Sequence, residues 1–264
     1  MKYTYEELAK TIDHSLLHPT MTDQDLEDGC KLAAKYGVAS VCIKPYAVKR
    51  AAKLLKGTGV LVGCVIGFPH GNSATEVKRY ETELACRDGA VEIDMVINLG
   101  KALSGDWDYV ERDIKAVCDE AHQRGAKVKV IFENDYLGNG GAGLSSDDFK
   151  RKLCQLCERA GADWVKTSTG YGFVKQPDGS YNYKGATEHD LALMRASVSA
   201  KVQVKAAGGI RDLDGLIKVR DLGATRCGAS ATVAILDECR KRAASPDRQN
   251  AIQPKKPKPG TGGY

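Results

Sequence analysis

The sequence has no long apolar run. Nowhere does it approach the roughly 18 consecutive apolar residues that a membrane span requires, so we expect no membrane segment. It also lacks a signal-like beginning, because MKYTYEELAK is polar and acidic where a secretory signal is basic and then apolar. Aromatic residues are few, at 6%, but 42% of the residues are hydrophobic, which is enough for one large core. We therefore expect a cytoplasmic globular protein.

A disulfide framework is also missing from the pattern, although there are nine cysteines. Their number is odd, and they are scattered through segments that are otherwise typical of helices and strands. Cys154 and Cys157 form the one C-x-x-C, with no second pair or nearby histidine. This usage is typical of small buried side chains in a reducing compartment, and no metal site is expected.

The formal charge of +5 is unevenly distributed. From Arg240 to Tyr264 there are seven Lys or Arg against one Asp, so the rest of the chain carries a net charge of −1. We divide the chain into a folded domain, 1–242, and a flexible, basic, Pro- and Gly-rich tail, 243–264. The tail leaves weak nucleic-acid binding open as an alternative. Nucleic acid is not the expected main partner, because the body is slightly acidic and the tail has no interleaved aromatic residues.

Apolar strand-like runs alternate with amphipathic helical patterns along the whole chain. In a single domain of this size, the alternation predicts parallel strands joined by helical crossovers. Eight units favour a (β/α)8 TIM barrel with a short N-terminal helix, while an open doubly wound sheet remains a minority alternative. The predicted strands are 12–17, 38–43, 60–67, 91–98, 128–133, 163–168, 202–208 and 225–230.

Two of these strands contain a lysine in an apolar setting: DWVKTS and VQVKAAG. Strand alternation places Lys166, Lys205 and the acidic Asp94 of VEIDMVIN on the inward faces, heading for the end of the barrel where active sites lie. The ordinary interpretation is that a buried carboxylate satisfies each lysine. Two lysines converging on one interior also favour the neutral amine, through burial and mutual repulsion. A neutral buried lysine is a nucleophile.

Two glycine-containing turns follow the seventh and eighth predicted strands, GGIR at 208–211 and CGAS at 227–230. Turns after these strands form the recurrent phosphate site of the barrel class, so we expect a phosphorylated substrate, although ordinary turns are the alternative. The G-x-G-x-x-G match at 138–143 does not predict a dinucleotide site. NDYL separates it from the preceding strand, and the acidic SSDD comes before the next helix.

At these residues the sequence resembles the deoxyribose-phosphate aldolase family of class I aldolases. The matching segments follow in family order and cover most of residues 10–240. They are DHSLL (13–17), VASVCIKP (38–45), GFP (67–69), EIDMVINLG (92–100), VKTSTGY (165–171), VKAAGGIR (204–211) and RCGAS (226–230).

The resemblance implies a (β/α)8 fold and reversible cleavage of 2-deoxy-D-ribose 5-phosphate to acetaldehyde and D-glyceraldehyde 3-phosphate, with no metal or organic cofactor. It implies that Lys166 forms the Schiff base, and that Lys205 perturbs its pKa and shares a proton relay with Asp94. It also implies a homo-oligomer, a dimer being favoured. The remaining residues that it assigns are Asp13, Ser15, Cys42 and Thr169 in the relay and pocket, and Gly170, Gly208, Gly209, Arg211, Gly228 and Ser230 at the phosphate.

Two segments, 134–147 and 171–187, look longer than the usual family loops, and QPDGS in the second is a turn signal. Both would lie at the mouth of the site, and three roles stay open for them: to reshape the mouth, to add cationic groups through Lys175 and Lys184, or to mediate contact between subunits. The chain ends in Tyr264, and in this it resembles family members whose terminal tyrosine reaches the pocket. The alternative is that Tyr264 is incidental and has no role in the site. A second hypothesis keeps the phosphate site but makes the lysines electrostatic groups of another barrel aldolase, isomerase or synthase.

Overall fold

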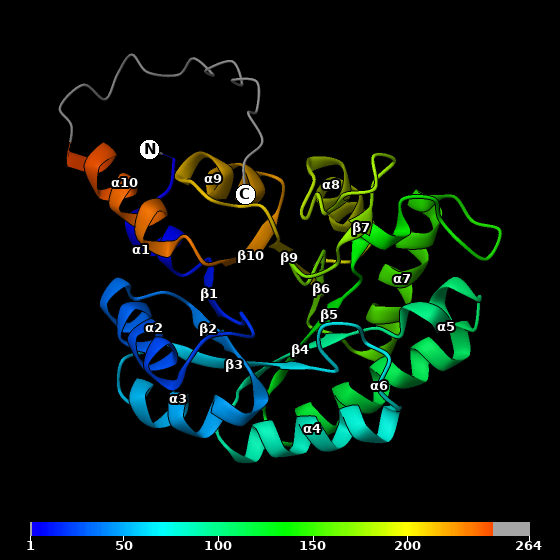
Figure 1. Cartoon of the computed structure of the whole chain (residues 1–264), viewed down its shortest axis with the longest axis horizontal. Coiled ribbons are helices and arrows are strands. Elements are labelled where there is room, and N and C mark those ends of the chain that lie inside the picture. Colours follow the sequence, from blue (N-terminus) through cyan, green and yellow to red (C-terminus); the bar gives the residue numbers. More distant parts are fainter. Residues whose placement is uncertain (1, 245–264) are drawn as a thin grey trace.

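Eight parallel strands close into a barrel in the computed structural model, which describes residues 2–244. Figure 1 shows the helices surrounding the strands. Around the barrel the order is β1-β10-β9-β6-β5-β4-β3-β2. The predicted TIM barrel is confirmed, and the open sheet is wrong. The strands are β1 Ile12–Leu16, β2 Ser40–Ile43, β3 Leu61–Ile66, β4 Glu92–Val96, β5 Lys127–Ile131, β6 Trp164–Lys166, β9 Gln203–Ala207 and β10 Ala224–Ala229.

Helices fill the connections, and apolar residues of each are buried against the barrel in one continuous core. Polar side chains mark several helix starts: Thr4 and Thr22, for example, both form capping boxes. The predicted short N-terminal helix is present. The helices are α1 Tyr5–Ala9, α2 Asp23–Tyr36, α3 Val48–Leu55, α4 Thr75–Arg87, α5 Leu99–Leu103, α6 Trp107–Gln123, α7 Ser146–Ala160, α8 Glu188–Ala196, α9 Leu213–Asp221 and α10 Thr232–Ala244, with short 3-10 turns η1 Pro45–Ala47 and η2 Asn134–Leu137.

The 171–187 segment contains the hairpin that its turn signal predicted. Strands β7 Val174–Lys175 and β8 Tyr181–Asn182 pair antiparallel, outside the barrel. Figure 1 shows this excursion beside α8, on the side of the molecule where β6 ends. Among residues 2–244, no helix is both long enough and apolar enough to cross a membrane.

The strand register places the charged residues of the apolar strands in neighbouring positions around the barrel. Lys166 on β6 is paired with Ile131 of β5 and with Lys205 of β9. One strand further along the barrel, Asp94 on β4 is paired with Lys129 of β5. Side chains that share a layer and point inward meet near the axis, so the fold itself gathers these charges.

A buried ion pair fastens the helical layer to the barrel behind β4. Lys78 on α4 and Asp113 on α6 have side chains exposed by only 0% and 1%, and their charged atoms are 2.6 Å apart. The same amine donates to the Val96 carbonyl at the end of β4 (2.9 Å). The pair therefore joins two helices to a strand through charges that have no access to water.

Removing one member of this pair should be costly, since it leaves the other charge buried and unpaired. We expect Asp113→Ala to lower the free energy of unfolding by about 3–5 kcal/mol in urea denaturation. The matched control is Asp119→Ala on the same helix, which removes the partner of the exposed Lys115 and should leave the urea midpoint unchanged. Equal midpoint shifts in the two variants would show that the buried pair is not a fastening point.

Candidate active site

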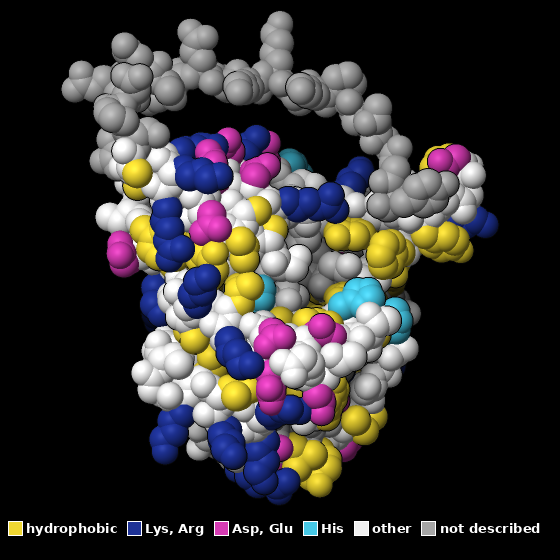
Figure 2. Space-filling model, turned by 60° about the vertical axis from the view of Figure 1, so that its left-hand side comes forward, with side chains coloured by type: hydrophobic (Ala, Val, Ile, Leu, Met, Phe, Trp, Pro, Cys, Tyr) yellow, Lys and Arg dark blue, Asp and Glu magenta, His cyan; other side chains and the backbone are white. Residues whose placement is uncertain are grey.

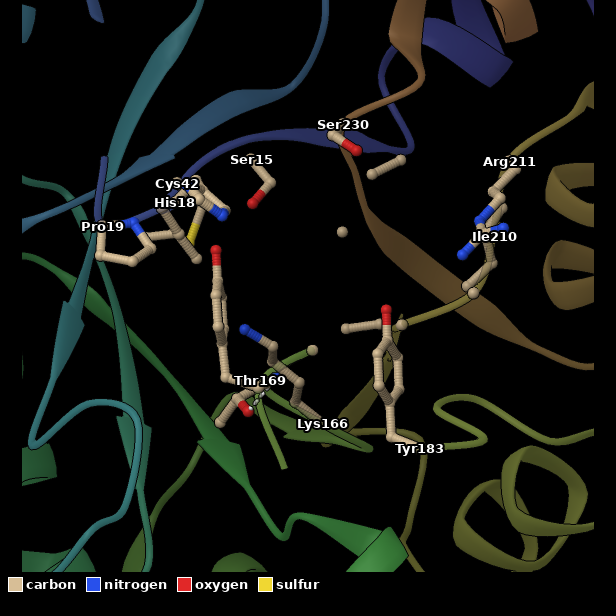
Figure 3. A pocket seen from close by; sticks show the side chains of 18 of the residues that line it. Ser15, His18, Pro19, Cys42, Lys166, Thr169, Tyr183, Ile210, Arg211 and Ser230 are labelled. Carbon is tan, nitrogen blue, oxygen red and sulfur yellow. Dashed lines mark hydrogen bonds between the residues drawn. The ribbon is translucent and has the colours of Figure 1, made fainter. Parts of the chain in front are cut away.

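A single cavity of about 900 Å³ opens at the ends of β1, β2, β6, β9 and β10. Figure 3 shows Lys166, Thr169 and Tyr183 projecting into it from one side and Ser15, Cys42 and Ser230 from the other. Most of the residues assigned by the resemblance line it: Ser15, Cys42, Lys166, Thr169, Gly170, Lys205, Gly208, Gly209, Arg211, Gly228 and Ser230. The sequence had therefore selected residues from five strands that the fold brings together.

The two remaining assigned residues, Asp94 and Asp13, lie fully buried beside the lysines. One oxygen of Asp94 accepts hydrogen bonds from both Lys166 Nζ and Lys205 Nζ, each at 2.7 Å. Asp13 is 2.6 Å from Lys205 Nζ. The Cys42 thiol donates weakly to the same Asp94 oxygen (3.8 Å). The ordinary interpretation, that a buried carboxylate satisfies each lysine, is thus correct as far as contacts go.

The two lysines nevertheless differ in their pKa. Burial lowers the pKa of Lys166, and the charge of Lys205 adds to this lowering, while Asp94 opposes it without cancelling it. For Lys205, burial also favours the neutral amine, but Asp13 and Asp94 together outweigh it and raise its pKa well above the ordinary value. Lys205 is therefore held in its charged form, and Lys166 is the lysine of the two that loses its proton more readily.

Two turns at the mouth complete the cavity. Gly208 and Gly209 follow β9 with φ of +89° and +84°, a conformation that side chains rarely adopt. Arg211 and Ser230 are exposed at the rim, and Ser230 is followed closely by the start of α10. A glycine turn, a guanidinium and a hydroxyl near a helix start are the groups that bind a phosphate monoester.

The known proteins most informative about this constellation are aldolases. The model of the DeoC/LacD family aldolases matches residues 8–237. This chain belongs to that family. A deoxyribose-phosphate aldolase of Rhodopirellula baltica is 50% identical over 92% of this chain and 94% of its own length. One from Aciduliprofundum boonei is 46% identical over 88% of this chain and 96% of its own.

Solved structures agree with this assignment. A deoxyribose phosphate aldolase from Aeropyrum pernix, described as having a unique tetrameric structure, superposes with a TM-score of 0.77 at 30% identity, covering 90% of this chain and 93% of that one. The fold expected from the resemblance and the class I aldolase assignment are therefore both established for this chain.

The sequence analysis missed the third lysine of the buried cluster in this aldolase. Lys129 on β5 is fully buried and lies 2.5 Å from Glu92 and 3.0 Å from the second oxygen of Asp94. Carboxylates raise its pKa, although burial acts in the opposite direction. Its signal was present in KVKVIF, which places a lysine inside an apolar strand as the other two motifs do.

Arg226 on β10 was named in the sequence only as part of the RCGAS motif, yet it belongs to the buried cluster of charged side chains around Asp94. Its guanidinium donates to Asp13 (2.6 Å) and to both oxygens of Glu92 (3.0 and 2.6 Å). The cluster then holds four basic groups, Lys129, Lys166, Lys205 and Arg226, against three carboxylates, Asp13, Glu92 and Asp94. A buried cluster is most stable when its charges balance, and balance is reached when Lys166 is neutral.

Glu133, after β5, is a second buried acid that sequence reasoning missed. It is 1% exposed and has a positive φ of 55°. Its two oxygens accept hydrogen bonds from the Thr169 amide (3.2 Å each), and one also accepts from the Thr169 hydroxyl. Thr169 lines the cavity three residues after Lys166, so Glu133 holds the turn that follows this lysine. Burial raises the pKa of Glu133 to about 7.

Two further predictions from the sequence can be compared with the structure, and a third cannot. Cys154 and Cys157 are buried in the α7 core, as small apolar side chains are. The 138–143 glycines lie in the connection from β5 to α7, where η2 separates them from the end of the strand. Tyr264 and the tail from residue 245 onward lie outside the described residues, so the role of Tyr264 stays a prediction.

The raised pKa of Glu133 predicts a pH-dependent stability. Its protonated form stabilises the fold fully below the ordinary pKa of 4.5, and this contribution is lost as pH rises towards 7. We expect Glu133→Gln, which keeps an acceptor for the Thr169 amide, to abolish this loss. The unfolding free energy of the wild type should fall relative to the variant by up to about 3 kcal/mol between pH 4.5 and 7.5.

Urea denaturation across this pH range measures the difference. Glu83→Gln serves as the control, because Glu83 is a partly exposed glutamate on α4 and its variant should follow the wild type. Parallel curves for the wild type and Glu133→Gln would show that Glu133 titrates normally.

Proposed function

We propose that this chain cleaves 2-deoxy-D-ribose 5-phosphate reversibly to acetaldehyde and D-glyceraldehyde 3-phosphate, with Lys166 as the Schiff-base nucleophile. The observation that carries the proposal is the buried Lys166 amine, whose pKa is lowered, on the wall of a cavity rimmed by phosphate-binding turns. The named relatives act on the same substrate class. The isomerase or synthase alternative gives no reason for Lys166 alone, among the four basic groups of the cluster, to have a lowered pKa.

In the proposed mechanism, neutral Lys166 attacks C1 of the open-chain sugar and forms a carbinolamine, which loses water to give an iminium ion. The C2–C3 bond then breaks, and its electron pair moves towards the iminium to form an enamine. The proton of the C3 hydroxyl passes at the same step through a water molecule to Asp94, and glyceraldehyde 3-phosphate is released. Protonation of the enamine at C2 and hydrolysis free acetaldehyde and restore the amine.

Asp94 and Lys205 support the proton transfers of this sequence. Burial alone would raise the pKa of Asp94, but Lys129, Lys166 and Lys205 hold it well below its usual range. Asp94 therefore holds the proton of the C3 hydroxyl only transiently before it returns the proton, through water, to C2 of the enamine, while Lys205 stays charged and orients the carboxylate. Ser15 and Cys42, which line the cavity opposite Lys166, border the reacting carbons.

Three wider parts of the proposal rest on the sequence and the relatives: a homo-oligomer with a dimer favoured, a cytoplasmic location, and a tail whose Tyr264 assists enamine protonation. Nucleic acid stays an unfavoured partner. On the face shown in Figure 2, basic and acidic side chains are interspersed over much of the described surface, which is unlike the continuous basic stripe of a nucleic-acid site.

Borohydride reduction tests the nucleophile. Incubation with acetaldehyde and borohydride should add a two-carbon ethyl group to Lys166, identified by mass mapping of its peptide, and should abolish cleavage of the sugar phosphate. Lys166→Leu should show neither adduct nor turnover, while Lys201→Leu, which removes an exposed lysine just before β9, should keep both. An active enzyme that gives no adduct at Lys166 would favour the electrostatic alternative.

The roles of Lys205 and Asp94 predict opposite shifts in the pH profile of kcat/KM, whose acid limb reports the deprotonation of Lys166. Lys205→Leu removes a charge that lowers the pKa of Lys166, so the acid limb should move to higher pH and activity at pH 7 should fall at least tenfold. Asp94→Asn removes the charge that raises it, so the limb should move to lower pH while C–C cleavage slows.

The second effect separates the chemical steps, since Asp94→Asn should spare borohydride trapping more than turnover. Shifts of the acid limb in the same direction in both variants would contradict the assigned electrostatics.

A further inference from the structure

The hairpin of residues 173–184 is fixed at both of its ends by η2, the turn that follows β5. The Asp135 carboxylate accepts hydrogen bonds from the backbone amides of Lys184 (2.5 Å) and Gly185 (3.0 Å) at the return end. At the outgoing end, the Tyr136 hydroxyl donates to the Phe173 carbonyl (3.3 Å). These contacts hold the hairpin in one position over the cavity.

The return end of the hairpin also packs against the glycine turn after β9. The Ala186 amide donates to the Gly208 carbonyl (3.1 Å). A Cβ atom on Gly208 would lie only 2.9 Å from Gly185 Cα and 3.4 Å from Tyr183 Cε2. The two backbones therefore approach as closely as glycine allows. The edge of the Tyr183 ring lies over the turn that contains the phosphate-binding glycines.

The side chains that the hairpin adds to the cavity are aromatic, not the cationic ones expected from the sequence. Phe173 and Tyr183 line it, whereas Lys175 and Lys184 do not. The two rings meet edge to face, with centroids 5.3 Å apart and an interplanar angle of 88°. This contact fixes the ring plane of Tyr183.

The hydroxyl of Tyr183 is bonded to the carbon next to Cε2, so it lies close to the Gly208 turn. Figure 3 shows the Tyr183 hydroxyl, the Arg211 guanidinium and the Ser230 hydroxyl bordering the same open part of the cavity. A phosphate monoester held by the Gly208–Gly209 turn would thus have a phenol donor within reach on the hairpin side.

We propose that Tyr183 is a substrate-binding residue, whose hydroxyl donates a hydrogen bond to a phosphate oxygen of the sugar phosphate. The inserted hairpin is then a wall of the phosphate site, and η2 positions it. The inference rests on the proposed function for the identity of the sugar, but the chemistry recognised is that of any phosphate monoester that fits the turn.

Tyr183→Phe tests the hydroxyl and keeps the ring contacts with Phe173 and Gly208. A hydrogen bond to a charged group at a partly exposed site corresponds to about a tenfold effect on binding. We expect KM for 2-deoxyribose 5-phosphate to rise about tenfold, with kcat within twofold, and KM for unphosphorylated 2-deoxyribose to stay unchanged. Tyr181→Phe, on the same hairpin but 64% exposed and outside the cavity lining, should leave all three values unchanged.

A binding measurement keeps this test separate from the aldolase proposal. The dissociation constant of glycerol 3-phosphate, a phosphate monoester that lacks a carbonyl group, should rise about tenfold in Tyr183→Phe by titration calorimetry, whatever the reaction catalysed. Unchanged affinity for both phosphorylated ligands, or equal losses for the phosphorylated and unphosphorylated sugars, would overturn the role of Tyr183. Failure of the Lys166 trapping experiment would instead overturn the aldolase mechanism.

Discussion

The site depends on one carboxylate shared among three lysine side chains. Asp94 lies 2.7 Å from both Lys166 and Lys205 and 3.0 Å from Lys129. A buried charge that lost such partners would cost several kcal/mol, so four strands of the barrel are tied together by this residue. The three lysines differ in how many carboxylates they contact. Lys205 and Lys129 each have a second carboxylate and stay charged, whereas Lys166 has Asp94 alone and faces the cavity.

Much of this arrangement could be predicted because it follows from strand alternation. Lys166 lies between Val165 and Thr167 in a short strand, so it points inward if these two neighbours point to the helices, and the eight-unit barrel pattern defines the inward side. The residue order in DWVKTS and VQVKAAG therefore predicted that Lys166 and Lys205 meet inside the barrel. The hairpin was equally local, since a QPDGS turn between short polar runs has few other structures to adopt.

The alternation of side chains along a strand predicts which face a residue occupies, but not how deeply it is buried in the barrel. For this reason the sequence did not single out Lys129. Lys127 and Lys129 occupy the same face of β5, yet Lys127 is exposed at the start of the strand and Lys129 is fully buried. Only the barrel register shows which of them reaches Asp94. Glu133 was beyond reach for a different reason: its burial depends on a positive φ and on a turn from another strand. The aromatic lining supplied by the hairpin depends likewise on contacts with η2, which is distant in sequence.

The buried cluster and the exposed rim should respond differently to ionic strength. Charges about 3 Å apart and without access to water are hardly screened by salt, so the ionisation of Lys166 is insulated from the medium. Arg211 is exposed, and the attraction of a doubly charged phosphate towards its guanidinium weakens as counterions accumulate. With the roles proposed for Arg211 and Lys166, raising the salt concentration would reduce substrate capture and leave the reactivity of the lysine unchanged. The proposed mechanism thus combines a salt-independent chemical step with a salt-dependent recognition step.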